Sequence, residues 1–379
     1  MKKTVCLNMV VKNDSLDIQR CLESVKSWID YWVIVDTGST DGTQQIIREF
    51  LKDLPGELHE IKGGDGAHNR NEALALAKNK GDYLFLIDAD QCLVEEADFV
   101  RPFLVADVYF LANRSIFEMN YQEFLIKNRL DWTWKGALYE IISSTQNKTN
   151  ETLKKIAMVS MTSKNQTKNS DKYLSDAAIL EKMVQEDLTN ARNVFYLAIS
   201  YVKAEKFEQA LETYEKRIAM GGDPEEVFAS MLALATLQEK MMMKPEQFIS
   251  SYNKAFQYRP TRAEPLYLMA KYYIGIKSYF LGYLIAQYAL TIPYPSDRGN
   301  VGFSVYDFEL LLQFAQCSHA LERPEDACSA YRKLIAKLEE YSTRRFCSQQ
   351  TKDSIATVLP GIKQYVEDNQ SKKNKSPSF

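Results

Sequence analysis

The first part of the chain alternates between two spacings of apolar residues. Continuous or period-two apolar runs are typical of strands, whereas apolar residues that recur every three or four positions are typical of amphipathic helices. The pattern predicts strands at 4–11, 31–36, 58–61 and 83–88, and helices at 16–26, 41–51 and 69–79 between them. This alternation indicates an α/β unit with a Rossmann-like, mostly parallel sheet covered by helices on both faces.

The apolar pattern becomes less regular after residue 100. Shorter strand-like runs follow at 107–111, 124–128 and 132–134. Residues 145–170 are rich in Thr, Asn, Lys and Ser, a composition that favours a poorly packed connector.

Helical periodicity replaces the strand pattern from about residue 171. Repeat frames that begin after residues 190, 228, 262 and 307 place small and aromatic residues where tetratricopeptide repeats have them, with Ala210, Tyr214 and Tyr252 as examples. These frames are 38, 34 and 45 residues apart, against about 34 for the ideal unit. We therefore predict an all-α, tetratricopeptide-like unit with an insertion near 293–298; an irregular helical bundle is the alternative.

These patterns divide the chain into three parts. We expect an α/β unit at 1–160, a helical unit at 161–368 and a disordered, polar and basic tail at 369–379. The length of 379 residues allows two or three domains.

Composition excludes several classes of protein. Hydrophobic residues make up 45% and charged residues 26%, which is ordinary for a soluble protein. The net charge of −3 gives no reason to expect a nucleic-acid partner. No apolar run reaches the roughly 20 residues of a transmembrane helix, and Asn8 and Lys12 interrupt the apolar N-terminus, which favours a strand over a signal peptide. Six cysteines without a CxxC pair suggest reduced thiols and a cytoplasmic location.

The first candidate functional residues lie at the end of the strand predicted at 83–88. Asp88 is the last residue of this strand, and Asp90 follows after Ala89. Ligands of open parallel sheets bind beyond the carboxyl ends of strands, and paired carboxylates suit a divalent cation. Such a cation could hold a nucleotide diphosphate and neutralise its charge as it leaves. Acidic residues also end strands without any ligand, so the pair alone is a weak signal.

A second polar group follows the strand predicted at 31–36. Asp36 and Thr37 stand at its carboxyl end and could hydrogen-bond a nucleobase or ribose, while Gly38 permits a tight turn. Asp41 is placed to cap the next helix.

Four segments together resemble the family-2 glycosyltransferases of the GT-A fold. They are 10–14 (VVKND), 35–41 (VDTGSTD), 68–73 (HNRNEA) and 88–90 (DAD), in the order and spacing of that family. Segments 195–198, 262–267 and 292–296 extend the similarity to members fused to a tetratricopeptide-like domain. The layout is similar to that of bacterial peptide S-glycosyltransferases, and the resemblance covers nearly the whole chain.

The resemblance implies roles for individual residues. The nucleoside pocket would be lined by Val10, Val11, Asn13 and Asp14, and the base would face Asp36 and Thr37. Relatives often have a second acid where Thr37 stands. Arg70 would approach the diphosphate; a surface arginine that supports the sheet is the alternative. His68 could orient Arg70 or touch the sugar. Asp88, Ala89 and Asp90 would contact the nucleotide-sugar, with Asp90 as the main ligand and Asp88 as a second ligand of Mn²⁺ or Mg²⁺.

The segment 132–140 departs from the family pattern. Relatives usually end it with Gly-x-x-His-Glu, and that histidine is a plausible third metal ligand; this chain has Tyr139 there, a poorer ligand than imidazole. Glu140 is retained and is the candidate catalytic base for an inverting displacement, with a role in fixing the loop as the alternative. Asp131, Glu95 and Glu96 are weaker candidates. Trp132 and Trp134 could stack on a sugar or belong to the core.

The expected function is therefore metal-dependent, inverting transfer of a sugar from a UDP-sugar. The acceptor is open: a protein or peptide held by the helical unit, a saccharide or a small molecule. The main alternative is a nucleotide-sugar-binding scaffold that has lost turnover through Tyr139. A nucleotidyltransferase is less favoured, because no Gly-rich, Arg/Lys-containing triphosphate signature lies near the first strand.

Overall fold

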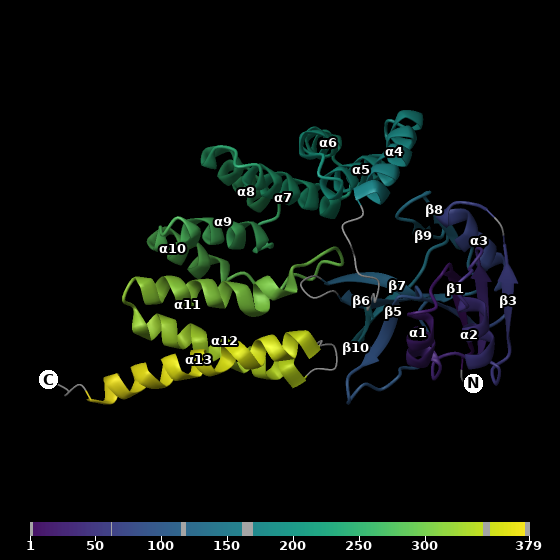
Figure 1. The fold of residues 1–379 in the computed structure, drawn as a ribbon, viewed down its shortest axis with the longest axis horizontal. Coiled ribbons are helices and arrows are strands. Elements are labelled where there is room, and N and C mark those ends of the chain that lie inside the picture. Colours follow the sequence, from purple (N-terminus) through teal and green to yellow (C-terminus); the bar gives the residue numbers. More distant parts are fainter. Residues whose placement is uncertain (1–2, 62, 115–118, 161–169, 344–348, 376–379) are drawn as a thin grey trace. The chain divides into compact units, whose positions relative to one another are not determined.

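The computed structural model describes residues 3–61, 63–114, 119–160, 170–343 and 349–375. The chain divides into two compact units, an N-terminal one from residues 1–115 and 119–168 and a helical one from residues 116–118 and 169–379. Strands and helices alternate in the first unit, and the second unit is helical (Figure 1).

An eight-stranded sheet organises the N-terminal unit. Its strand order is β3-β2-β1-β4-β7-β6-β10-β5. The neighbours β3, β2, β1 and β4 are parallel, β7 is antiparallel to both β4 and β6, and β10 is parallel to β6 and antiparallel to β5. The strands are β1 (Val5–Val11), β2 (Tyr31–Asp36), β3 (Gly56–Glu60), β4 (Tyr83–Leu86), β5 (Gln91–Glu95), β6 (Val108–Arg114), β7 (Met119–Lys127) and β10 (Asn150–Ser160). The predicted mostly parallel sheet is confirmed.

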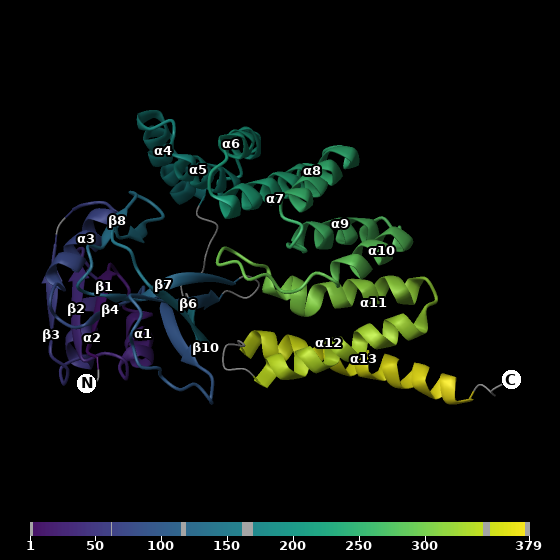
Figure 2. The ribbon, with the colours of Figure 1, turned by 180° about the vertical axis from the view of Figure 1, so that it is seen from behind.

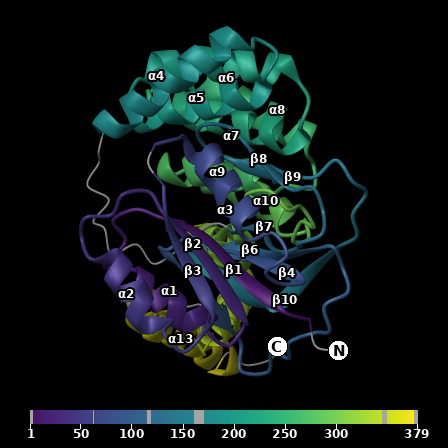
Figure 3. The ribbon, with the colours of Figure 1, turned by 90° about the vertical axis from the view of Figure 1, so that its right-hand side faces the viewer.

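Helices cover both faces of the parallel strands. Leu7 and Met9 of β1 pack on the side of α1 (Ile18–Val25) and α2 (Thr43–Phe50). Cys6, one position away, packs on the other side with α3 (Gly66–Leu76). Side chains of a strand point alternately to the two faces of a sheet, and Figure 3 shows α1 and α2 on one side of β1–β3 and α3 on the other.

The connector predicted at 145–170 is wrong over most of the described part of that segment. β10 is an 11-residue strand in the interior of the sheet, and Ile156, Ala157 and Met158 are buried. A register shift between Thr152 and Ala157, with Lys155 at φ +64°, interrupts the pairing with β6. A bulge of this kind breaks the period-two pattern by which a strand is recognised in a sequence. Residues 161–169 lie outside the described ranges.

The second unit consists of helices that follow one another as antiparallel pairs (Figure 2). The pairs are α5 with α6, α7 with α8, α9 with α10 and α11 with α12, preceded by α4 and followed by α13. Their bounds are α4 (Ser170–Glu186), α5 (Ala191–Lys203), α6 (Phe207–Met220), α7 (Pro224–Lys240), α8 (Pro245–Tyr258), α9 (Glu264–Gly275), α10 (Tyr279–Ala289), α11 (Leu310–Ala320), α12 (Pro324–Thr343) and α13 (Gln349–Lys375). The unit is a tetratricopeptide-like helical repeat, as predicted.

The same turn closes all four helix pairs. Glu205, Met242, Lys277 and Glu322 each stand two residues after the first helix of a pair, with φ between +55° and +61°. The amide of the following residue donates to a carbonyl five residues earlier, as in Ser278 to Tyr273 at 2.8 Å. This is a Schellman turn, which usually takes glycine at the positive-φ position. Its repetition identifies the repeats independently of their degenerate sequence.

Two further segments differ from the simple repeat pattern. The insertion ends in a π-helical turn at Val305–Glu309, directly before α11. At the other end, α13 continues to Lys375 and so includes most of the segment 369–379 that we expected to be a disordered tail; residues 376–379 lie outside the described ranges. The five cysteines of the described ranges are buried and free, and Cys347 is not among those residues.

A buried ion network fastens the insertion to the third repeat. The guanidinium of Arg262, whose side chain is 2% exposed, lies 2.7 Å from Glu264 and 3.0 Å from Glu225. It also donates to the carbonyl of Asn300 at 2.7 Å. Tyr306 donates to Glu264 at 2.7 Å from within the insertion. Burial opposes the charge of Arg262, but Glu264 and Glu225 raise its pKa, so the guanidinium stays charged.

We expect Arg262→Leu to destabilise the helical unit by about 3–5 kcal/mol, because removal of one partner leaves the buried Glu264 carboxylate without its counter-charge. Urea unfolding followed by far-UV circular dichroism measures the change. Arg323→Leu is the matched control: Arg323 is 48% exposed and lies 3.9 Å from Asp326, so it should cost less than about 1 kcal/mol. Equal midpoints for the two variants would contradict a structural role for the network.

Candidate functional site

The candidate site lies at the carboxyl ends of β1, β2 and β4. These strands are parallel and adjacent, with Val11 opposite Asp36 and Asn8 opposite Leu86. The segment Asp88–Asp90 therefore begins next to the end of β1, with the end of β2 on the far side of β1. Gln91 fixes the conformation of this turn through two hydrogen bonds. Its side-chain oxygen accepts from the backbone amide of Asp88 at 3.2 Å, and its backbone amide donates to the carbonyl of Asp88 at 3.0 Å.

The two carboxylates have different surroundings. Asp88 is 47% exposed, and one of its oxygens accepts from Arg70 at 2.8 Å. Burial raises the pKa of Asp90, and the negative charges of Asp88, Asp14 and Asp17 raise it further. An excess of negative charge therefore gathers around Asp90, a setting that a bound cation would stabilise.

Arg70 joins the carboxylates to the rest of the site. It projects from α3, and its Nε lies 3.9 Å from Oε2 of Glu140 while its Nη2 binds Asp88. The guanidinium also lies 4.9 Å from the centre of the Trp134 ring. Burial opposes the charge of Arg70, but Asp88 and Glu140 raise its pKa. The structure thus brings together Asp88, Arg70 and Glu140 from three separate segments.

A short hairpin carries Glu140 to this place. Its strands are β8 (Thr133–Lys135) and β9 (Ile141–Ser143), which pair antiparallel to each other. Asn71, the neighbour of Arg70 on α3, holds β8 by donating to the carbonyl of Trp134 at 3.0 Å and accepting from its amide at 2.8 Å. Asn71 belongs to the segment 68–73 that resembles the family, but that resemblance predicts no particular role for it.

Glu140 also lies close to the start of α3. A Cβ atom on Gly66, the first residue of that helix, would be 1.4 Å from Oε1 of Glu140. Only glycine leaves room for the carboxylate in this position, and the positive end of the helix dipole favours a negative charge there. The turn before Glu140 holds Gly136 at φ +101° and Tyr139 at φ +54°. Positive φ is unusual for a bulky residue and occurs where the surrounding structure imposes it.

The residues predicted to line the nucleoside pocket shape the loops around it. Asp36 is fully buried, and its Oδ1 accepts from the amides of Gly38 and Ser39, each at 2.8 Å. Burial alone would raise its pKa, but the hydrogen bonds from Ser39, Gly38 and Gln44 outweigh it and lower the pKa. Among the described residues, Oδ2 of Asp36 has no hydrogen-bond partner.

Backbone and side-chain bonds also fix the other predicted nucleoside residues. Thr37 donates to the carbonyl of Val11 through its amide and its hydroxyl. Asn13 accepts from the amide of Thr40 at 2.9 Å, and the amide of Asp14 donates to Thr43 at 2.9 Å. Val10 is partly buried in β1. The loops after β1 and β2 are thereby held together, with Val11 opposite Asp36 and Asn13 bound to Ser39 and Thr40.

Asp131 and Glu95, two of the weaker candidates for the catalytic base, form other hydrogen bonds. Asp131 accepts from the hydroxyls of Ser144 and Thr145, which lowers its pKa. Glu95 accepts from the indole of Trp28 at 2.6 Å, beside α1. His68 is exposed on the first turn of α3, and no hydrogen bond of its ring to a described residue is present. Trp132 donates to the carbonyl of Lys127 and is partly buried.

Asp88 and Asp90 alone provide only part of a binding site for a hard divalent cation. Across the described residues, no group of three or more His, Cys, Asp or Glu side chains is arranged to hold a metal ion. The chemistry of the pair nevertheless suits Mg²⁺ or Mn²⁺, since Mg²⁺ is commonly bound by one or two carboxylates together with substrate phosphates and water. The raised pKa of Asp90 agrees with such a role.

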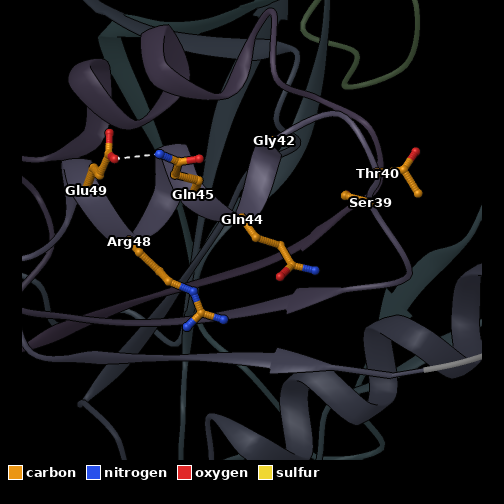
Figure 4. A pocket seen from close by; sticks show the side chains of 7 residues that line it. All are labelled: Ser39, Thr40, Gly42, Gln44, Gln45, Arg48 and Glu49. Atoms are coloured by element: carbon orange, nitrogen blue, oxygen red, sulfur yellow. Dashed lines mark hydrogen bonds between the residues drawn. The ribbon is translucent and has the colours of Figure 1, made fainter.

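A separate hollow of about 560 Å³ lies beside the start of α2. Its lining residues are Ser39, Thr40, Gly42, Gln44, Gln45, Arg48 and Glu49 (Figure 4). Gln44 reaches from this wall to Asp36 at 3.1 Å, so the hollow borders the loop after β2. Neither Asp88 nor Asp90 lines it.

The chain thus combines an α/β domain, which has a polar site at the carboxyl edge of its parallel strands, with a unit of helical repeats. Residues 6–162 match the family described as glycosyl transferase family 2, so the N-terminal unit is a family-2 glycosyltransferase domain.

The chain is also similar to individual proteins. A TPR repeat-containing protein of Synechococcus elongatus is 39% identical over 93 residues, 24% of this chain and 22% of that protein. The SPbeta prophage-derived glycosyltransferase SunS of Bacillus subtilis is 30% identical over 93 residues, 24% of this chain and 21% of that protein. Each match spans about a fifth of the curated relative's length.

The chain also has partial similarity to solved structures, at low sequence identity. The crystal structure of the MamA protein is 12% identical with a TM-score of 0.36, covering 47% of this chain and 89% of that chain. The S. aureus TarS structure is 15% identical with a TM-score of 0.35, covering 65% of this chain and 54% of that chain. None of the helices in the described ranges has both the length and the apolar composition needed to cross a membrane.

We expect Asp90→Asn to raise the melting temperature of the metal-free protein by up to a few degrees at pH 7. The pKa of Asp90 is raised in the folded protein, so its stabilising contribution is complete below the ordinary pKa and is lost as the pH rises through the folded pKa. Asparagine mimics the protonated form. The variant should also lose any increase in melting temperature that Mn²⁺ gives the wild type, as calorimetry would show.

Asp98→Asn is the control for this comparison. Asp98 is 70% exposed and pairs with Lys155 at 2.6 Å, which lowers its pKa. Its replacement should not stabilise the protein and should leave the response to Mn²⁺ intact. If both variants responded to Mn²⁺ like the wild type, Asp90 would not be a metal ligand.

Proposed function

We propose that the protein transfers a sugar from a UDP-sugar to an acceptor, with inversion at the anomeric carbon and with Mn²⁺ or Mg²⁺ bound near Asp90 and Asp88. The observation that carries the proposal is the line of Asp88, Arg70 and Glu140 at the carboxyl edge of the sheet. This arrangement supports the proposal, because the proposed reaction needs a carboxylate on the donor side, a cationic group and a base close together.

Different residues have different roles in the proposed reaction. The nucleoside lies against Val10, Val11, Asn13, Asp14 and the loop of Asp36 and Thr37, which the buried Asp36 carboxylate holds through the amides of Gly38 and Ser39. A divalent cation would supply charge neutralisation to the diphosphate. Arg70 adds a positive charge on the same side and holds Asp88 in place.

Glu140 is the proposed general base. An acceptor X–H attacks the anomeric carbon as the bond from that carbon to the diphosphate oxygen breaks, and the acceptor proton passes to Glu140. The electron pair of the broken bond leaves with UDP. Arg70 lies 3.9 Å from Glu140, so the candidate base stands beside the cationic group of the site.

The helical unit is the proposed acceptor holder. Stacked helix pairs present an extended concave surface that suits a peptide or protein segment. SunS, which matches part of this chain, is itself described as a glycosyltransferase. A saccharide acceptor remains the other class that the test below separates.

The alternative function is a nucleotide-sugar-binding scaffold without turnover. The specific observation in its favour is Tyr139, which stands at φ +54° where the family pattern has histidine. This alternative predicts that the donor binds without hydrolysis or transfer, and that Tyr139→His raises metal affinity.

The first experiment is donor binding and hydrolysis across UDP- and GDP-sugars with Mn²⁺ or Mg²⁺. We expect one UDP-sugar to bind and to be slowly hydrolysed by the wild type, and Asp90→Ala to abolish both. Glu140→Gln should bind the donor normally and lose transfer by about 100-fold or more. Peptide and saccharide acceptor pools then identify the acceptor class. Binding without any turnover by the wild type would favour the scaffold.

Gly66→Ala tests the placement of Glu140 without changing a charged residue. The added Cβ would displace the carboxylate, because it would lie 1.4 Å from Oε1. We expect transfer to fall about 100-fold, since small misplacements of a reacting group have effects of this size. Donor binding should change little, and the melting temperature should stay equal or rise, because alanine favours a helix more than glycine.

Gly275→Ala is the matched control for Gly66→Ala. It also lies in a helix, at the end of α9, and an added Cβ there meets nothing within 4 Å. Its transfer rate should equal that of the wild type. Full activity of Gly66→Ala would mean that Glu140 does not act from the position seen in the structure.

A further inference from the structure

Trp134 contacts two consecutive residues of α3. The side chain of Asn71 donates to the Trp134 carbonyl at 3.0 Å and accepts from its amide at 2.8 Å. The guanidinium carbon of Arg70 lies 4.9 Å from the centre of the Trp134 ring, within the distance of a cation–π contact. One turn of α3 therefore holds both the backbone and the ring of this tryptophan.

The Trp134 ring has little freedom to move away from Arg70. It is partly buried and packs against the cluster of buried apolar side chains that includes Leu74 of α3 and Ile142 of β9. Trp134 and Ile142 are also paired between β8 and β9. Because the strand pairing, the apolar packing and the two hydrogen bonds to Asn71 all fix the residue, its ring is a rigid surface beside α3.

Arg70 is a side chain that such a surface can hold in place. An arginine side chain has many rotamers, and ordering it costs conformational entropy. Nη2 of Arg70 binds Asp88 at 2.8 Å, but its Nε lies 3.9 Å from Glu140, beyond hydrogen-bond distance. A guanidinium that lies over an aromatic ring keeps the N–H groups at its edge free to donate. The ring can therefore hold Arg70 while its N–H groups bind Asp88 or a ligand.

We propose that Trp134 is a positioning residue, whose ring holds the guanidinium of Arg70 between Asp88 and Glu140. This role differs from the two considered from the sequence, which were stacking on a sugar and packing in the core. The inference rests on the proposed function only in so far as Arg70 serves the diphosphate of the donor. Trp134 acts through Arg70 and not on the donor itself.

Nuclear magnetic resonance of the arginine side chains tests the position of Arg70 directly. Protons above an aromatic ring resonate upfield, so the Nε–H signal of Arg70 should move downfield in Trp134→Leu. The signal is assigned by its absence from Arg70→Lys. Trp134→Phe retains a ring and should keep most of the upfield position. Asn71→Ala removes both hydrogen bonds to the backbone of Trp134 and should move the signal in the same direction as Trp134→Leu.

Ligand affinity tests the consequence for the donor site. With Mn²⁺ present, Trp134→Leu should bind UDP about tenfold more weakly than the wild type, because the Arg70 side chain must then be ordered on binding. Its affinity for uridine, which has no phosphate for Arg70 to contact, should be unchanged. Trp134→Phe should bind UDP almost as well as the wild type. A role in core packing alone would instead lower both affinities together.

Trp132→Leu is the matched control. Trp132 is partly buried, packs against the same apolar cluster and has Lys148 at 5.3 Å from the centre of its ring. Its replacement removes the same side-chain volume at a tryptophan whose cation is Lys148 and not Arg70. The Arg70 signal and the affinity for UDP should therefore stay at their wild-type values, and melting temperatures show whether each variant is folded.

An Arg70 signal that keeps its position in both Trp134→Leu and Asn71→Ala would overturn the proposal. So would an equal loss of UDP affinity in Trp134→Leu and Trp134→Phe, because side-chain volume would then explain the effect. A wild type that binds no UDP would contradict the proposed function, and the Arg70 signal would still decide the role of Trp134.

Discussion

The parallel pairing of β1 with both β2 and β4 is the constraint on which the N-terminal unit depends. It sets the carboxyl ends of three strands side by side, so that loops far apart in the sequence meet at one edge. The register is fixed by burial on both faces: Leu7 and Met9 face α1 and α2, while Cys6 faces α3. A shift of one residue would exchange these faces. The positions of Asp36 and Asp88 therefore follow from the packing of the core.

The parallel part of the fold could be predicted from the sequence because local signals agree with the final structure. Strands β1, β2 and β4 are apolar runs bounded by polar residues, and each lies within a predicted range. The antiparallel part could not be predicted in the same way. β10 carries a bulge beside Lys155, and β5 begins within the turn shaped by Asp88 and Gln91. Long-range pairing, which the sequence does not display, decides both strands.

The candidate site, too, could be predicted from the sequence only in part. Asp88, Ala89 and Asp90 could be expected at the sheet edge because a buried strand ends there, and the family pattern indicated Arg70 and Glu140. No pattern indicated the role of Gly66 or of Asn71. Gly66 matters because it lacks a side chain where Glu140 lies, and Asn71 matters because it binds both backbone groups of Trp134. Such roles come from contacts between segments about 70 residues apart.

Arg70 lies between Asp88 and Glu140, and this has a consequence for how the site would respond to a ligand. Its guanidinium binds Asp88 at 2.8 Å but lies 3.9 Å from Glu140, so the first contact is a hydrogen bond and the second is mainly electrostatic. A diphosphate near Asp88 would compete for the same guanidinium. Any movement of Arg70 toward the phosphate would weaken its hold on Asp88 and change the charge felt by Glu140. Arg70 therefore connects Asp88 with Glu140. Its backbone is fixed in α3, and its neighbour Asn71 fixes the hairpin that carries Glu140.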